Sequence, residues 1–289
     1  MEKRITATTT LLGLLGSPVS HSTSPAMMNL AASLLGLDYA YLAFDVKEDQ
    51  VPAALDAMRT LNIRGYNVTM PDKIAAAKNV DKLSPASEII GASNTVVNDN
   101  GVLTGYITDG EGYVNMLKDN GIDIKGKKVV VAGGGGAATA IEVQSALDGA
   151  AAVTIFNIKD KFFDRTLATA DKIREKCPDC EVKVCDLADA DALAEEISKS
   201  DIFSNATIVG MKPMENESII KDTSVFRPGL IVTDAVYNPV ETKLLREAKA
   251  AGCTTIGGKG MLMWQGVASF KLFTGHDMPV EEIRKAFFS

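Results

Sequence analysis

The sequence predicts an α/β protein of two domains, the second of which is built on a doubly wound parallel sheet. The chain has 289 residues, which is more than one hydrophobic core usually supports. From Lys127 onward, apolar runs rich in Val and Ile alternate with segments of helical periodicity. Apolar strands of this kind are typical of a parallel sheet with helices on both faces.

The N-terminal part of the chain shows the same alternation less regularly, and we expect another α/β domain there. Strands are predicted in LLGLLG, YAYLAFDV, IRGYNVTM, ASNTVV and VLTGYIT. Helices are predicted around residues 25–35, 49–60 and 72–78. A helix over residues 111–120 then leads to the next domain through the turn-rich KDNGIDIKG.

The following segments fit a doubly wound domain. Strands are predicted in KKVVVAG, AVTIFN, EVKVCD, DIFSNAT, GLIVTDAVY and CTTIGG, with helices in FFDRTLATADKIREK and ADALAEEISKS. Beyond Gly260 the pattern is helical, through MLMWQGVASFKLFTG and PVEEIRKAFFS. We therefore expect domains at residues 1–111 and 112–258, with residues 259–289 packing back on the first.

The composition excludes several classes of protein. Thirty Lys and Arg against thirty-seven Asp and Glu give a net charge of −7, which argues against a nucleic-acid surface. No run approaches the ~18 apolar residues of a membrane span, and the N-terminus lacks a secretory pattern. We expect a cytoplasmic protein, either a monomer or a homodimer. Cys177 and Cys180 form a C-x-x-C pair, but no second pair or nearby His completes a metal site, so no metal is expected.

A glycine loop follows the first strand of the second domain. Gly133, Gly135 and Ala138 form a G-x-G-x-x-G/A pattern at the opening of a predicted helix. Glycine lets the backbone approach a pyrophosphate, whose charge then meets free N–H groups at the positive end of the helix. In this setting the loop predicts a dinucleotide cofactor; the alternative is a glycine-rich turn without a ligand.

The residues after the next strand, in FNIKDKFF, indicate which dinucleotide is bound. Asp160 can accept hydrogen bonds from the ribose hydroxyls, and its charge would repel a 2′-phosphate. Ile158 cannot bind a phosphate, although Lys159 could. NAD is therefore preferred, and NADP stays possible. Alternatively, Asp160 caps a helix that begins at Lys161.

Polar groups also follow several strand candidates of the first domain. They lie in HSTSP at 21–25, NVTMPDK at 67–73, ASNT at 92–95 and YITDG at 106–110. Because ligands bind at the carboxyl ends of strands in α/β sheets, we expect these groups to converge.

A series of motifs in order along the chain points to a family. They are GSPVSHSTSPAMMN, GYNVTMPDK, GASNTVV, GYITDGEGY, AGGGGAATA, NATIVGMKP, DAVYNPVETKLL and GGKGMLMWQG. Over essentially its whole length the chain resembles the shikimate dehydrogenase family, most closely its quinate/shikimate dehydrogenase branch. So many ordered motifs are far more specific than any one of them.

The resemblance implies a substrate-binding domain followed by a Rossmann-type NAD(P)-binding domain. It implies an oxidoreductase that interconverts shikimate and 3-dehydroshikimate, quinate and 3-dehydroquinate, or both. Lys73 and Asp109 match the catalytic pair. Lys73 would serve as the general base in alcohol oxidation and as the acid in the reverse direction, while Asp109 would hydrogen-bond the lysine and a ring hydroxyl.

The resemblance also implies the ligand contacts. Ser22 and Ser24 match the serines that bind the substrate carboxylate. The complete substrate set is Ser22, Ser24, Thr69, Lys73, Asn94, Asp109, Tyr237 and Gln265. The cofactor set is Gly133, Gly134, Gly135, Gly136, Ala137, Asn157, Ile158, Lys159, Asp160, Ala235, Val236, Tyr237, Asn238 and Gly258.

Some of the matched residues could have a purely structural role, and the sequence differs from the family's motifs at two positions. Lys73 could be a solvated lysine at a helix start, and Asp109 could cap a helix that begins near Glu111. Ile107 stands where the family usually has an asparagine, which leaves ring-substituent preference open, and the arginine of NADP-dependent members is missing. A non-catalytic NAD-binding metabolite sensor and a dehydrogenase of an amino-substituted ring acid are the alternative functions.

Overall fold

The chain forms two compact units in a computed structural model that describes residues 5–160 and 163–288. Unit 1 comprises Met1–Thr108 and Gln265–Ser289, and unit 2 comprises Asp109–Trp264. The chain thus passes from unit 1 to unit 2 and returns, and the boundaries of these units lie at 108/109 and 264/265.

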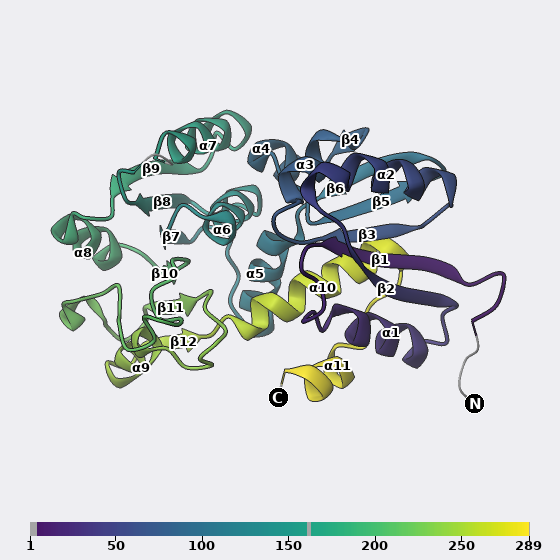
Figure 1. Cartoon of the computed structure of the whole chain (residues 1–289). Helices are drawn as coiled ribbons and strands as arrows, with labels where there is room; N and C mark the ends of the chain where they lie inside the picture. Colours follow the sequence, from purple (N-terminus) through teal and green to yellow (C-terminus); the bar gives the residue numbers. More distant parts are fainter. Residues whose placement is uncertain (1–4, 161–162, 289) are drawn as a thin grey trace. The chain divides into compact units, whose positions relative to one another are not determined.

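Unit 1 contains a six-stranded mixed sheet in the order β2-β1-β3-β5-β6-β4 (Figure 1). The central strand β1 pairs in parallel with β2 and β3, whereas β5 runs antiparallel to both β3 and β6. The strands are β1 (Thr10–Gly16), β2 (Tyr39–Asp45), β3 (Gly65–Val68), β4 (Lys82–Leu83), β5 (Thr95–Asp99) and β6 (Val102–Tyr106).

Helices cover both faces of this sheet. On one face α1, α10 and α11 bury Met27, Met28 and Phe270 against β1 and β2. On the other face α2 buries Leu55 and Met58 against β1 and β3. The helices of this part are α1 (Ser24–Leu34), η1 (Glu48–Gln50), α2 (Val51–Thr60), α3 (Lys73–Lys78), α4 (Pro85–Ile90), α10 (Lys259–Thr274) and α11 (Val280–Phe287).

Unit 2 contains a six-stranded sheet, all of it parallel, in the order β12-β11-β10-β7-β8-β9. This is the doubly wound order, with its reversal between β7 and β10. The strands are β7 (Lys128–Ala132), β8 (Ala152–Asn157), β9 (Glu181–Asp186), β10 (Ile202–Asn205), β11 (Ile231–Asp234) and β12 (Thr254–Ile256). The helices are α5 (Thr108–Asp119), α6 (Gly136–Leu147), α7 (Phe163–Lys176), α8 (Ala190–Ser198), η2 (Thr223–Val225) and α9 (Lys243–Ala250).

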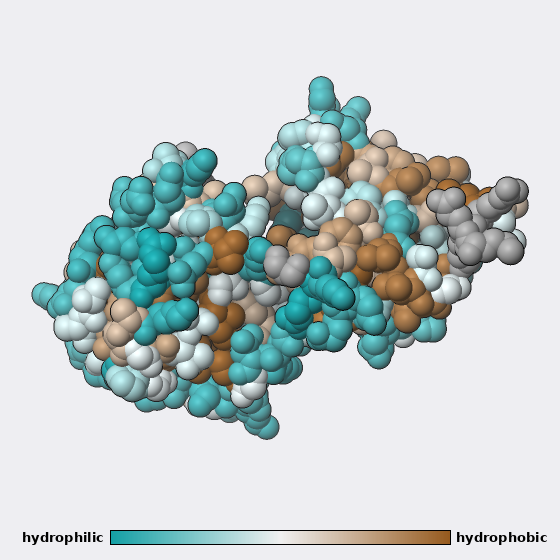
Figure 2. Space-filling model, turned by 90° about the horizontal axis from the view of Figure 1, so that it is seen from below, coloured by the Kyte–Doolittle hydropathy of each residue, from teal (hydrophilic) through white to brown (hydrophobic). Residues whose placement is uncertain are grey.

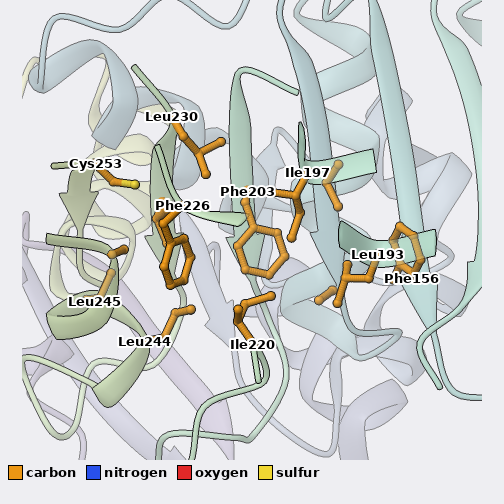
Figure 3. Close-up of a cluster of buried hydrophobic side chains, with 14 residues drawn as sticks. Phe156, Leu193, Ile197, Phe203, Ile220, Phe226, Leu230, Leu244, Leu245 and Cys253 are labelled. Atoms are coloured by element: carbon orange, nitrogen blue, oxygen red, sulfur yellow. The ribbon is translucent and has the colours of Figure 1, made fainter. Parts of the chain in front are cut away.

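Alternate residues of these strands face opposite layers, as the pleat requires. On one face, Phe203 of β10 lies among side chains of η2, α8 and the loops, including Phe226, Ile220 and Ile197 (Figure 3). Its neighbour Ser204 points the other way, and its hydroxyl pairs with that of Tyr113 in α5 at 2.5 Å. Burial of apolar surface on both faces is the main stabilising term for such a sheet.

A buried carboxyl in α6 carries a stability cost. The side chain of Glu142 is 1% exposed, and its Oε1 has no hydrogen-bond partner. Burial raises the pKa of Glu142 to about 8, against an opposing effect of the Arg165 charge. The hydroxyl of Ser145, one turn further along the helix, is also buried without a partner.

We expect Glu142→Gln to raise the melting temperature above pH 8. The native state keeps the Glu142 proton up to about pH 8, whereas the unfolded chain loses it near 4.5, so stability falls as pH rises through this window. Removing the buried charge should recover about 1–4 kcal/mol at pH 8.5 and little at pH 4.5. Thermal unfolding at both pH values checks this. The exposed Glu175→Gln is the control, and an equal Tm change at both pH values would contradict the account.

The surface is polar over most of the face shown in Figure 2, with smaller hydrophobic areas between the charged side chains. In the part of the chain that the structure describes, no helix combines the length and the apolar composition needed to cross a membrane.

Candidate functional site

The polar segments predicted to converge in unit 1 do lie at one edge of its sheet. Strands β1, β3 and β6 end there, and the antiparallel β5 begins there, since Asn67 near the end of β3 pairs with Thr95 at the start of β5. The segments after β1, β3 and β6 and the segment before β5 are therefore neighbours. This is the edge at which ligands bind in sheets of this class.

Thr69 and Lys73 follow β3 directly. The backbone N–H of Thr69 donates to the carbonyl of Leu15 at 2.9 Å, which attaches this segment to the end of β1. Lys73 is the first residue of α3, and its carbonyl accepts from the N–H of Ser93 at 2.9 Å. Both side chains are half-buried. The sharp turn from strand to helix thus places the lysine at the sheet edge.

Asp72 lies beside the lysine and is fully buried. Neither of its carboxylate oxygens has a hydrogen-bond partner. Burial, with a smaller effect of the Glu48 charge, raises the pKa of Asp72. A buried carboxyl without partners favours its neutral form.

Asn94 is held in a dense hydrogen-bond network, which limits the contacts that it can make. Its Oδ1 accepts from the backbone N–H of Thr108 at 2.8 Å and from the Thr95 hydroxyl at 3.0 Å. Its Nδ2 donates to Thr108 Oγ1 at 3.0 Å. A carboxamide has two N–H donors, so one donor is committed to this network.

The centre of the network is Asn67, which the sequence did not single out. Its Nδ2 donates to Thr95 Oγ1 at 3.0 Å and to Ser269 Oγ at 2.9 Å, and its Oδ1 accepts from the hydroxyl of Tyr41 at 2.9 Å. Ser269 Oγ also lies 3.1 Å from Thr108 Oγ1 and 3.0 Å from the carbonyl of Gln265. Buried polar groups that are fully paired in this way fix the relative positions of their elements. In the sequence, Asn67 is the first residue of the N-V-T motif, and this motif could have pointed to it.

Ser22 and Ser24 lie in the loop between β1 and α1. Ser24 is the first residue of α1, and its N–H donates to Ser22 Oγ at 3.2 Å. Both side chains are half-buried. Ser22 and Ser24 therefore lie at the start of a helix, where a negative group is favoured.

Asp109 lies inside the first turn of α5, which begins at Thr108 and not near Glu111. It therefore does not occupy the capping position before the helix, and a carboxylate in a first turn interacts favourably with the helix dipole. Ile107 immediately before this helix is 6% exposed, so its side chain belongs to the packed interior.

The glycine loop of unit 2 lies at the point where the strand order reverses. Gly133 adopts φ +130°, and a Cβ at this position would lie 2.7 Å from the carbonyl oxygen of Ala206, after β10. Gly135 and Gly136 face open space, and no side chain caps the start of α6. A loop of this shape with uncapped helical N–H groups fits the pyrophosphate of a dinucleotide.

The last residue of β8 is buried, whereas the residues that follow it are exposed. Asn157 is 6% exposed, donates to Thr166 Oγ1 at 2.9 Å and packs under Gly134. Ile158, Lys159 and Asp160 are exposed. The predicted helix start at Lys161 lies outside the described residues.

A second buried network orders the loops after β10 and β11. Asp234 accepts from Thr242 Oγ1 at 2.7 Å, from the N–H of Val236 at 3.0 Å and from Asn205 Nδ2 at 3.0 Å. Burial raises the pKa of Asp234 to about 6, although these hydrogen bonds oppose the shift. The network supports the segment Ala235–Asn238, in which Tyr237 is exposed.

Gly258 lies against this segment, because a Cβ there would lie 2.4 Å from the carbonyl oxygen of Ala235. Within the described ranges, no group of three or more His, Cys, Asp or Glu side chains could hold a metal ion.

Two family models match the chain. One, described as the shikimate dehydrogenase substrate binding domain, matches residues 14–96, and the other, the shikimate 5′-dehydrogenase C-terminal domain, matches residues 258–286. A quinate/shikimate dehydrogenase of Escherichia coli (strain SMS-3-5 / SECEC) is 49% identical over 97% of this chain and 97% of its own length.

Solved structures agree with these matches. Shikimate 5-dehydrogenase from Listeria monocytogenes, crystallised with shikimate and NAD, is 49% identical with a TM-score of 0.96, and the alignment covers 100% of this chain and 99% of that one. Quinate dehydrogenase from Corynebacterium glutamicum, in complex with NAD, is 31% identical with a TM-score of 0.84 and coverages of 96% and 98%.

Proposed function

Because this chain belongs to the shikimate dehydrogenase family, we propose that it is an NAD-preferring dehydrogenase of shikimate, quinate or both. It would interconvert these ring acids with their 3-dehydro ketones. The observation that carries the proposal is the convergence of Thr69, Lys73 and Asn94 at one edge of the sheet of unit 1. Hydroxyl, ammonium and amide groups are the partners that a small polyhydroxylated acid requires.

The proposed proton path uses Lys73 and Asp109. Bound NAD supplies the hydride acceptor for the carbon that carries the secondary alcohol. In alcohol oxidation the neutral amine form of Lys73 would take the hydroxyl proton as the ketone forms, and in the reverse direction the ammonium form would return it. Asp109 hydrogen-bonds the lysine and a neighbouring ring hydroxyl, which keeps the ammonium group oriented.

The remaining substrate contacts follow from the same arrangement. Ser22 and Ser24 bind the carboxylate at the start of α1. Asn94 uses its second N–H for a ring hydroxyl, and Gln265 approaches the ring from α10. The proposed set is Ser22, Ser24, Thr69, Lys73, Asn94, Asp109, Tyr237 and Gln265.

The cofactor is proposed to bind unit 2 along the carboxyl ends of its strands. The glycine loop would hold the pyrophosphate, Asp160 the adenosine ribose, and Ala235–Asn238 the nicotinamide. The proposed set is Gly133, Gly134, Gly135, Gly136, Ala137, Asn157, Ile158, Lys159, Asp160, Ala235, Val236, Tyr237, Asn238 and Gly258. Asn157 contributes by supporting Gly134 from below.

We expect the double substitution Ile158→Arg and Asp160→Ser to shift preference towards NADP. Arginine offers a bidentate phosphate contact, and serine removes a repelling charge. The ratio of kcat/KM for NADP to that for NAD should rise by about 10-fold or more. Initial rates with both cofactors measure this ratio, and an unchanged ratio would count against the assigned role of Asp160.

A non-catalytic NAD-binding metabolite sensor is a weaker alternative, because a sensor needs no acid/base lysine at its binding edge. A dehydrogenase of an amino-substituted ring acid is another alternative. The enzyme is further proposed to act in the cytoplasm as a monomer or a homodimer, without a nucleic-acid or membrane partner.

The test is a set of initial rates with shikimate, quinate and an amino-substituted analogue, each with NAD and NADP. The proposal predicts turnover of shikimate or quinate, faster with NAD. Protein that binds NADH but turns over none of these acids would favour the sensor, and turnover of the analogue alone would favour the sister dehydrogenase.

A further inference from the structure

The ends of β8 and β9 form one wall of the proposed adenosine site, and they bring two acidic residues to the same edge. Asn157 and Asp186 are register partners in the parallel pair, and the N–H of Leu187 donates to the carbonyl of Asn157 at 2.9 Å. The segment after β9 therefore runs beside the segment that holds Lys159 and Asp160. The carboxylate of Asp186 is held in place at this edge, because its Oδ1 accepts from the N–H of Ala188 at 3.0 Å.

Lys159 is paired across this edge. Its Nζ lies 3.5 Å from Oδ2 of Asp186, with side-chain exposures of 63% for the lysine and 26% for the aspartate. The carboxylate of Asp186 is the less exposed of the two groups, and the turn after β9 fixes its position. The flexible side chain of Lys159 therefore adapts to form the pair.

We propose that Asp186 is a second residue that determines cofactor specificity, because it holds the ammonium group of Lys159 at the end of β9. This inference rests on the proposed function, in which the adenosine ribose binds beside Asp160. In the described part of that segment, which ends at Asp160, Lys159 is the residue with a cation suited to a phosphate on the ribose. Paired with Asp186, its charge is already compensated and is less available to a phosphate.

The chemistry of the two cofactors explains why this matters. NADP differs from NAD by a phosphate with a charge near −2 on the ribose, and the carboxylate of Asp186 competes with this phosphate for the ammonium group of Lys159. NAD presents neutral hydroxyls at this position, so its affinity does not depend on the pairing of Lys159 with Asp186. Exposed ion pairs are weak, so Asp186 should adjust selectivity by several-fold, as an addition to the larger effect of Asp160.

The test is the affinity of the whole protein for NADP and NAD, measured by calorimetry without any ring acid. Asp186→Asn keeps an oxygen for the N–H of Ala188 and removes the charge. We expect NADP to bind about 3–10-fold more tightly to this variant, with NAD affinity changed less than about twofold and Tm unchanged. Asp179→Asn, the same charge change at the opposite end of β9, should leave both affinities unaltered.

A double-mutant cycle separates the proposed pairing from a general charge effect. Lys159→Ala in the Asp186→Asn background should abolish the gain in NADP affinity. Unchanged NADP affinity in Asp186→Asn would overturn the inference, as would a gain that survives without Lys159 or that Asp179→Asn reproduces. Failure of the unaltered protein to bind NAD would instead contradict the proposed function itself.

Discussion

Lys73→Ala is expected to lower kcat by about 10²–10⁴-fold, the range for loss of a positioned acid/base group. The lysine stands at the start of α3, where the turn after β3 brings it to the edge that gathers Thr69 and Asn94. Without it, the alcohol loses the proposed acceptor of its proton as the ketone forms. Steady-state rates of the purified variant in both reaction directions measure the loss.

The affinity for NAD should survive this substitution, because the proposed cofactor residues belong to unit 2 and Lys73 to unit 1. Lys78→Ala is a matched control, since Lys78 is the last residue of the same helix and is exposed. It should retain full activity. Turnover by Lys73→Ala at the level of the unaltered protein would remove the lysine from the mechanism.

Gly133→Ala is expected to cause the second large effect, through the backbone. Gly133 has φ +130°, and an added Cβ would lie 2.7 Å from the carbonyl oxygen of Ala206. Neither β7 nor the segment after β10 can move without disturbing the sheet. The glycine loop must therefore change its conformation. We expect a loss of about 1–3 kcal/mol of stability and at least about a 10-fold loss of NAD affinity, equal to ~1.4 kcal/mol.

Gly135→Ala provides the comparison. Gly135 has a negative φ, and an added Cβ would meet no atom within 4 Å. Its Tm should equal that of the unaltered protein, even where the methyl group hinders the cofactor. Thermal unfolding and calorimetry with NAD distinguish the two variants. An unaltered Tm and NAD affinity in Gly133→Ala would contradict the role assigned to this loop.

The fold of unit 2 could be predicted from the sequence because the strands β7 and β8 are short, mainly apolar runs. VVV in β7 and VTIF in β8 are buried on both faces. Such runs can be recognised as strands without knowing which strands they pair with. The glycine loop was equally clear, since its position between a strand and a helix decides its meaning.

Unit 1 was less predictable because its sheet is mixed and some of its elements are short. Strand β4 has two residues and α4 has six, too few for a periodic pattern. The antiparallel pairing of β5 with β6 did have a local signal. Asn100 and Gly101 both have positive φ in the connecting turn, and Asn-Gly is the strongest short hairpin signal.

The support beneath the candidate site could not be read from the sequence. Asn67 reaches Ser269, 202 residues further along the chain, and Lys159 reaches Asp186 on the neighbouring strand. Contacts of this kind depend on which strands pair and where helices return, which is tertiary information. Individual motifs indicated the reacting groups, but not the side chains that hold them.

One single-turnover measurement tests the central claim most directly. The protein is mixed with NAD and with shikimate or quinate that carries deuterium on the carbon bearing the reacting hydroxyl, and the mass of the reduced cofactor is determined. If this carbon gives its hydride to the nicotinamide, the reduced cofactor carries the deuterium. Cofactor that binds but stays oxidised with both acids, or that is reduced without deuterium, would contradict the assignment of this protein as a ring-acid dehydrogenase.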